Sequence, residues 1–152
     1  MEEIIVTSIG FGLVVSLLFS EIFGIAAGGM VVPGYFALFL DRPLIIITTL
    51  LVAYLSYTLV RTLSSFLIIY GRRRTVLMII TGFVLGSILR TFGQSFIADT
   101  HLELNVIGYI IPGLIAIWID RQGLIETISV LTIASTVVRL GLILIYGGDI
   151  LP

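Results

Sequence analysis

Long runs of apolar residues, separated by short polar or glycine-containing stretches, dominate the hydrophobic pattern of this chain. We distinguish six runs, at residues 4–20, 22–40, 44–70, 75–98, 104–119 and 124–146. A helix needs about 20 apolar residues to cross the hydrocarbon core of a bilayer, which is about 30 Å thick. The pattern therefore predicts an all-α integral membrane protein with about six transmembrane segments, of which the third is long enough to tilt.

The second and fifth runs are interrupted. Pro33 and Gly34 divide the second run, and Pro112 and Gly113 divide the fifth. Proline removes a backbone donor and glycine loosens a helix, so neither run is expected to form one continuous helix. The backbone groups that such a break frees must be satisfied by protein or by a water-lined cavity. The breaks therefore predict either a binding or permeation site or close-packing points between repeats.

The two interrupted runs share one motif, "VVPGYFALFLDRP" in the first half of the chain and "IIPGLIAIWIDRQ" in the second. In each copy the proline precedes the aspartate by eight residues, from Pro33 to Asp41 and from Pro112 to Asp120. Equivalent residues of the two copies are 79 positions apart. Two copies with identical spacing indicate a duplicated unit.

Weaker matches extend the duplication beyond the motif. Arg61 and Arg139 are 78 positions apart, and the stretch "GFGLVVSLL" loosely matches "GFVLGSIL". We interpret the chain as a single membrane domain, residues 1–152, made of two three-segment repeats, residues 1–74 and 75–152.

Three segments per repeat favour inverted repeats, because an odd number of crossings reverses the orientation of the second copy. Broken segments in matching positions are a plan found in membrane transporters. Re-entrant hairpins in place of the middle segments would instead make the repeats parallel, and the sequence leaves this alternative open. The basic cluster Arg72, Arg73 and Arg74 is expected on the cytoplasmic side. Six crossings then place both termini outside, whereas two hairpins place them in the cytoplasm.

Three arginines, Arg61, Arg90 and Arg139, lie inside apolar runs. An arginine at the centre of a transmembrane helix costs about 2.5–3.5 kcal/mol on insertion scales, so it usually faces a cavity or a partner. Two interpretations stay open: a structural role, by snorkelling or by ion pairs with Glu21 or Glu126, and contact with an anion. By helical spacing the arginines extend polar stripes made of Tyr54, Tyr57, Thr58 and Ser65, of Ser87, Thr91 and Gln94, and of Glu126, Ser129, Thr132 and Thr136.

The remaining charged positions have plainer interpretations. The triple arginine is a topology signal, or a docking surface for an acidic cytoplasmic partner or an anionic lipid. The motif-end charges, Asp41 with Arg42 and Asp120 with Arg121, are expected to cap helix ends and to pair locally. Two small-xxx-small spacings, which let membrane helices approach closely, are found at Gly24 with Gly28 and at Gly82 with Gly86.

Composition narrows the chemistry. Hydrophobic residues make up 59% of the chain, charged residues 11%, and the net charge is −1, so no nucleic acid partner is indicated. Cysteine and lysine are absent and all eight cations are arginine, a planar donor that stays protonated. There is no phosphate-binding loop, no HExxH and no paired Cys/His spacing, and His101 is interpreted as a solvated loop residue. We therefore expect no catalytic residue, no metal site and no cofactor in this chain.

Three stretches together resemble one known family. The stretches "SEIFGIAAGGMVVPGYFALFLDRP", "FLIIYGRRR" and "GYIIPGLIAIWIDRQGL" look like the CapC/PgsC family of bacterial poly-γ-glutamate synthesis proteins. The resemblance covers nearly the whole chain in length, order and segment pattern. Where members of that family often end the second motif with a Gln-Lys type pair, this chain has Asp120 and Arg121, of which Arg121 keeps the positive charge.

The resemblance implies a role in the bacterial cytoplasmic membrane. It implies a non-catalytic, multi-pass subunit of the poly-γ-glutamate synthase, which makes a polymer for capsule or release. It also implies a CapB/PgsB-like cytoplasmic ligase as partner, which would carry ATP and Mg²⁺, and a CapA/PgsA-like external subunit. The polymer bears one carboxylate per residue, and Arg61, Arg90 and Arg139 would suit contact with it. Alternatives are an independent small-anion secondary transporter, which would need a homo-oligomer, a purely structural scaffold, and, least favoured, a self-sufficient enzyme.

Overall fold

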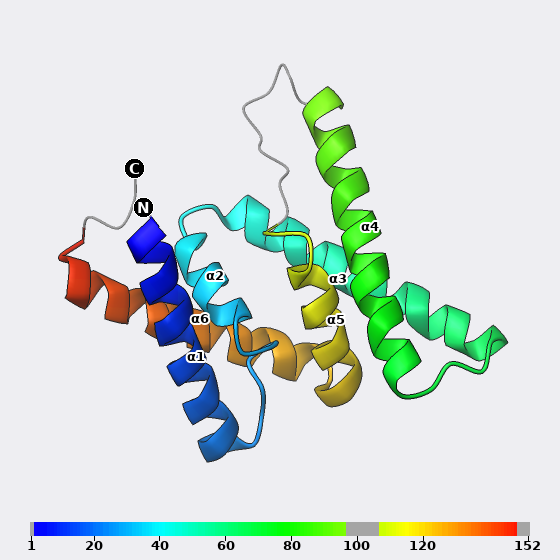
Figure 1. Cartoon of the computed structure of the whole chain (residues 1–152), viewed down its shortest axis with the longest axis horizontal. Coiled ribbons are helices and arrows are strands. Elements are labelled where there is room, and N and C mark those ends of the chain that lie inside the picture. Colours follow the sequence, from blue (N-terminus) through cyan, green and yellow to red (C-terminus); the bar gives the residue numbers. More distant parts are fainter. Residues whose placement is uncertain (1, 97–106, 149–152) are drawn as a thin grey trace. The chain divides into compact units, whose positions relative to one another are not determined.

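The computed structural model describes residues 2–96 and 107–148, with the side chains of residues 94–96 excepted, and their regular structure is helical (Figure 1). His101 and the side chain of Gln94 lie outside the described residues. The prediction of an all-α chain is confirmed. The helices are α1 (Glu2–Phe23), α2 (Val32–Leu38), α3 (Pro43–Phe66), α4 (Arg72–Phe96), α5 (Ile111–Gln122) and α6 (Leu124–Tyr146).

Four of the described helices are long and apolar enough to cross a membrane: α1, α3, α6, and α4 over Arg72–Gly93. The middle segments of the two repeats form shorter helices, of 7 residues in α2 and 12 residues in α5. At about 1.5 Å per residue, neither helix reaches the roughly 30 Å of a bilayer core. Among the described residues, four of the six expected segments thus form helices that are long enough to span, while a crossing by the middle segments stays a prediction, as does the inverted arrangement.

Prolines begin three of the helices. Pro33 and Pro43 lie in the first turns of α2 and α3, and Pro112 is the second residue of α5. Proline suits the first turn because a backbone N–H there has no intrahelical acceptor in any case. The Pro-Gly pairs therefore start the short helices, and the interruption of the first middle segment lies before them, in the non-helical residues 24–31.

One predicted helix-packing pair lies in this non-helical stretch. Gly24 and Gly28 have φ angles of 64° and 73°, in the left-handed region that favours glycine. Because Gly24 and Gly28 do not lie in a helix, they cannot share a helix face, and the prediction that they form a small-residue helix contact is wrong.

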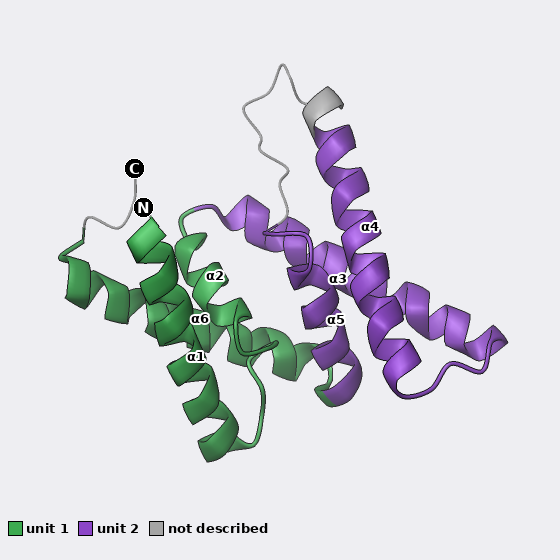
Figure 2. Cartoon of the chain, viewed as in Figure 1, with its two compact units in different colours: residues 1–41, 122–152 green, residues 42–121 purple. Residues whose placement is uncertain are grey.

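The helices form two compact units, shown in different colours in Figure 2. The first unit, residues 1–41 and 122–152, contains α1, α2 and α6, and the second, residues 42–121, contains α3, α4 and nearly all of α5. Each unit thus combines the first and middle segments of one sequence repeat with the last segment of the other.

The first unit is held together by small and branched apolar side chains. Its three helices contact one another, and α2 runs antiparallel to α1 (Figure 1). Phe11 and Phe19 of α1 pack against this core from the side. The buried core consists of Val15, Ala27, Ala37, Ala134, Val138 and Leu142.

Glycine lets α1 and α2 touch through their backbones. A Cβ added at Gly12 would lie 2.7 Å from the Cα of Gly34, and one added at Gly34 would lie 2.7 Å from the carbonyl oxygen of Ser8. The Ser8 hydroxyl donates a hydrogen bond of 2.7 Å to the Gly34 carbonyl. This contact fixes the start of the short helix against α1, in the manner of small-residue contacts in membrane proteins.

The second unit repeats this contact between α4 and α5. A Cβ added at Gly82 would lie 2.7 Å from the Cα of Gly113, and one added at Gly113 would lie 2.7 Å from the Cα of Ile79. Gly12 therefore corresponds to Gly82, 70 positions apart, whereas the sequence match had aligned Gly10 with Gly82.

The remaining helices of the repeats also bury equivalent positions. The shared buried positions of α2 and α5, 79 residues apart, are Val32 and Ile111, Pro33 and Pro112, Gly34 and Gly113, Phe36 and Ile115, and Ala37 and Ala116. In α3 and α6, Thr49 and Thr127 are both buried, as are Val60 and Val138, each pair 78 residues apart. The duplicated sequence pattern thus corresponds to duplicated packing within the units.

Candidate functional site

Arg139 of α6 holds the end of the short helix α2 in the first unit. Its Nη1 donates to the carbonyl oxygen of Ala37 at 3.0 Å, and its Nη2 donates to Oδ2 of Asp41 at 2.5 Å. The Ala37 carbonyl lies in the last turn of α2, where carbonyls lack an intrahelical donor. The Arg139 side chain is 15% exposed and that of Asp41 is 51% exposed. Arg139 therefore both pairs with a carboxylate and satisfies a helix end.

The equivalent aspartate of the second unit has a different partner. Asp120, at the end of α5, pairs with Arg74 of α4. Arg61, which the repeat equates with Arg139, is instead exposed, contacts the Tyr57 hydroxyl and lies 5.7 Å from the centroid of that ring. In both units the aspartate pairs with an arginine that is distant in sequence, and the expected local pairing with Arg42 and Arg121 stays a prediction.

Arg90 lies over an aromatic ring. Its guanidinium carbon is 4.4 Å from the centroid of Tyr109, within the range of a cation–π contact. The Tyr109 ring also contacts Phe83, with 5.5 Å between centroids. Each of the three arginines predicted to contact an anion thus has its own set of neighbours within its unit.

The polar stripes lie mostly on the surfaces of their units. Tyr54, Arg61 and Ser65 of α3 are exposed. On α6 the exposed members are Glu126, Ser129, Thr132 and Thr136, whereas Arg139 is turned inward. In the described residues the stripes therefore do not line a groove inside either unit.

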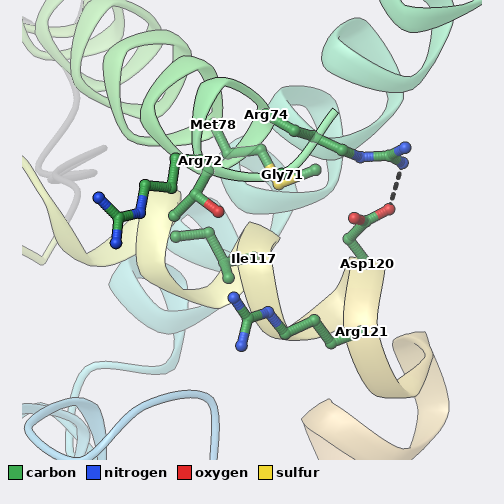
Figure 3. A pocket seen from close by; sticks show the side chains of 8 residues that line it. Gly71, Arg72, Arg74, Met78, Ile117, Asp120 and Arg121 are labelled. Atoms are coloured by element: carbon green, nitrogen blue, oxygen red, sulfur yellow. Dashed lines mark hydrogen bonds and ion pairs between the residues drawn. The ribbon is translucent and has the colours of Figure 1, made fainter. Parts of the chain in front are cut away.

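A cavity of about 390 Å³ lies in the second unit, between the start of α4 and the end of α5 (Figure 3). Three guanidinium groups and one carboxylate contribute to its lining, which leaves a net charge of +2 (three minus one). The lining residues are Gly71, Arg72, Arg74, Thr75, Met78, Ile117, Asp120 and Arg121.

The arginines of the cavity divide into two sets. Figure 3 shows Arg74 turned toward Asp120, with which it pairs, while Arg72 and Arg121 extend to the opposite side. Ile117 lies between the latter two, and Met78, only 1% exposed, adds a further apolar surface. Two cationic side chains therefore face the cavity without sharing the Asp120 carboxylate.

A tight turn begins α4 beside the cavity. Gly71 has a φ of 62°, and its carbonyl accepts the N–H groups of Arg74 at 3.2 Å and Thr75 at 3.4 Å. This geometry places Arg72 and Thr75 in the first turn of the helix, where the positive end of the helix dipole also lies.

Two hydrogen-bond donors beside the cavity have no protein acceptor. Among the threonines that the structure describes, Thr75 alone makes no hydroxyl hydrogen bond, whereas the others bond to a carbonyl of their own helix. The Nε of Arg74 is buried and has no acceptor among the described residues. The Thr75 hydroxyl is thus a spare donor of the lining, whereas the Nε of Arg74 is enclosed by protein.

The structure brings together residues that the sequence had suggested separately. Arg72 and Arg74 were assigned to a basic cluster and Asp120 and Arg121 to a motif end, and all four line one cavity. Arg73, the middle member of the cluster, is exposed and does not line it. Sequence reasoning missed Gly71 and Thr75, because neither residue has a distinguishing pattern in an apolar chain.

Comparison with known proteins gives one consistent result. Residues 11–128 match the family described as Capsule biosynthesis CapC. The PGA biosynthesis protein CapC of Bacillus subtilis (strain 168) is 44% identical over 117 residues, covering 76% of this chain and 78% of that protein. The Capsule biosynthesis protein CapC of Bacillus anthracis is 39% identical over 125 residues, covering 82% and 83%. No solved structure matches the chain.

Proposed function

Because the chain belongs to the capsule biosynthesis CapC family, we propose that it is a non-catalytic membrane subunit of a poly-γ-glutamate synthase. In this role it anchors a cytoplasmic, ATP-dependent glutamate ligase of the CapB/PgsB type, which carries ATP and Mg²⁺. It also assists the passage of the anionic polymer across the cytoplasmic membrane, toward an external subunit of the CapA/PgsA type.

The observation that carries this proposal is the pair of short Pro-Gly helices. Each packs against a long apolar helix through a backbone contact between two glycines, Gly34 with Gly12 and Gly113 with Gly82. Broken segments in matching positions of two repeats are found where membrane proteins bind and move a substrate. Such segments are tolerated in a bilayer because their irregular backbone is enclosed by protein or lines a cavity.

The first unit encloses its irregular backbone in this way. Ala27, Gly28 and Gly29 are buried although they are not helical. The carbonyl of Gly29 accepts the Ser16 hydroxyl at 3.3 Å. Buried non-helical backbone inside an apolar protein supports a substrate-handling role more than a role as a simple anchor.

The exposed arginine of α3 supports contact with the polymer. Poly-γ-glutamate carries a carboxylate on every residue, and the arginine fork binds carboxylates in a bidentate manner without losing its proton. Arg61 presents its guanidinium at the surface of its unit. All three arginines have protein neighbours, so polymer carboxylates would have to compete with Tyr57, Tyr109 and Asp41 for them.

The proposed subunit role is tested by co-purification. The chain, extracted in detergent with the products of its neighbouring genes, is expected to retain the ligase and to support ATP-dependent polymerisation of glutamate. The ligase extracted without this chain is expected to lose most of that activity. A ligase that neither co-purifies nor depends on the chain would contradict the proposal and would favour the independent anion transporter.

A second prediction concerns topology. The Arg72–Arg74 turn is expected in the cytoplasm and both termini outside, because basic residues are retained on the cytoplasmic side. The absence of cysteine makes labelling clean. Single cysteines at positions 2 and 150 are expected to react with an impermeant maleimide in intact cells. Protection in intact cells together with labelling after lysis would replace the six-crossing arrangement by two hairpins.

A further inference from the structure

We propose that the arginine-lined cavity of the second unit binds the phosphate group of an anionic phospholipid. This inference goes beyond the proposed synthase role, since it concerns a ligand that neither the polymer nor the ligase supplies. It rests on the charge of the cavity, its spare donor and its position at the end of an apolar helix.

The charge of the cavity suits a phosphate. Its lining carries three guanidinium groups and one carboxylate, and the carboxylate of Asp120 is already paired with Arg74. Arg72 and Arg121 extend to the same side of the cavity (Figure 3). Guanidinium groups suit a phosphate, whose oxygens accept several charge-assisted hydrogen bonds at once.

The spare donor adds geometry to this charge. The Thr75 hydroxyl has no acceptor among the described residues, although every other threonine that the structure describes has a hydrogen bond. Thr75 lines the same cavity, in the first turn of α4, where the helix dipole also favours an anion. The cationic lining, the Thr75 hydroxyl and the helix dipole are separate features, and each of them favours an anion in this cavity.

The position of the cavity favours a lipid over a soluble anion. Arg72 is the first residue of a helix long and apolar enough to cross a membrane, and such a crossing would place the cavity at the level of the lipid headgroups. Arg121 lies over the ring of Trp118, 5.6 Å from its centroid, and tryptophan is enriched at membrane–water interfaces. Basic pockets at the cytoplasmic ends of transmembrane helices bind anionic headgroups.

The apolar part of the lining also fits a lipid. Met78 and Ile117, which are 1% and 8% exposed, give the lining a small apolar part that the glycerol of a lipid can contact. A chain of poly-γ-glutamate has charged and amide groups throughout and no apolar segment to place there. A phospholipid therefore matches both the cationic and the apolar residues of the lining, whereas a polymer carboxylate matches only the cationic ones.

The test uses the purified full-length chain without its ligase, so its outcome is separate from that of the synthase proposal. Binding of phosphatidylglycerol is measured by native mass spectrometry after delipidation, with phosphatidylcholine as the neutral probe. The double variant Arg72→Gln/Arg121→Gln is expected to bind phosphatidylglycerol at least about tenfold more weakly, since two charge-assisted contacts are lost. Thr75→Val, which keeps the shape and loses the hydroxyl, is expected to weaken binding about fivefold.

Arg73 provides the matched control. Arg73→Gln removes one positive charge from the same cluster, against two charges in the double variant, and leaves the cavity lining intact. This variant is expected to bind phosphatidylglycerol within about twofold of the parent chain, in line with a general surface attraction. Equal weakening by Arg73→Gln and the double variant would overturn the proposal, because it would show charge attraction without a site.

Competition identifies the ligand. Inorganic phosphate is expected to reduce lipid binding, whereas soluble poly-γ-glutamate at the same charge concentration is expected to have little effect. If the polymer displaces the lipid more strongly than inorganic phosphate does, the lipid assignment is overturned and the polymer is the ligand of the cavity. If the double variant loses its helical circular dichroism, Thr75→Val and Arg73→Gln decide the question by themselves.

Discussion

Replacing Gly12 with alanine is expected to destabilise the chain by about 1–3 kcal/mol or more, the range for overpacked interiors. The added Cβ would lie 2.7 Å from both the Cα and the amide nitrogen of Gly34. Both are backbone atoms and cannot move aside as a flexible side chain would, so α1 and α2 must separate. The measurement is thermal unfolding of the detergent-solubilised chain, together with its level in the membrane.

Gly10, in the same helix, is the matched control. A Cβ at Gly10 meets nothing within 4 Å, so Gly10→Ala carries no steric cost. Alanine is favoured over glycine in a helix by about 1 kcal/mol, so this variant is expected to be as stable as the parent or slightly more so. Equal unfolding temperatures for the Gly10 and Gly12 variants would show that α1 and α2 do not touch at Gly34.

Replacing Arg61 with methionine is expected to leave folding intact and to reduce polymer output about tenfold, since each lost charge-assisted hydrogen bond is worth about 1.5–3 kcal/mol. Arg61 is exposed and its guanidinium contacts Tyr57 of its own helix, so among the described residues the change breaks no hydrogen bond to another helix. Arg61→Lys is expected to restore output only in part, because lysine lacks the bidentate fork. Protein level, ligase association and exported polymer are measured in parallel.

Arg139→Met provides the contrast. This change leaves the Ala37 carbonyl and the Asp41 carboxylate without a partner, and it is expected to lower stability as well as output. The loss from Asp41 is modest because that side chain is half-exposed and screened by solvent. Normal polymer output from a stable Arg61→Met chain would remove Arg61 from any polymer route and would favour a scaffold role.

The sequence identifies most of the charged residues that line the cavity, but it does not show that they lie together. Arg72, Arg74, Asp120 and Arg121 stand out as charges in an apolar chain. Nothing in their spacing shows that Arg74 meets Asp120, 46 residues away, or that Arg73 is left outside. Which member of a basic cluster faces inward depends on the rotation of α4 about its axis, and that rotation is set by contacts such as Gly82 on Gly113.

The partner of Arg139 illustrates the same limit. Asp41 is 98 residues away, at the end of a short helix whose length the apolar run did not reveal. The duplicated motif would have paired Arg61 with Asp120 by the same logic, yet Asp120 pairs with Arg74. A sequence repeat thus predicts equivalent backbone packing better than equivalent ion pairs, because a long, flexible arginine side chain can reach several different carboxylates.

The sequence by itself determined the helical class, the apolar character, the duplicated motif and, to within about three residues, the starts of the four long helices. These properties follow from local physics: apolar runs favour burial in lipid or protein, and proline favours a first helical turn. Only the tertiary structure decided that α6 packs with α1 and α2, that Gly12 corresponds to Gly82, and that four distant charges line one cavity. Those outcomes depend on which surfaces fit at close range, and a glycine that admits a neighbouring backbone is indistinguishable in sequence from one that meets nothing.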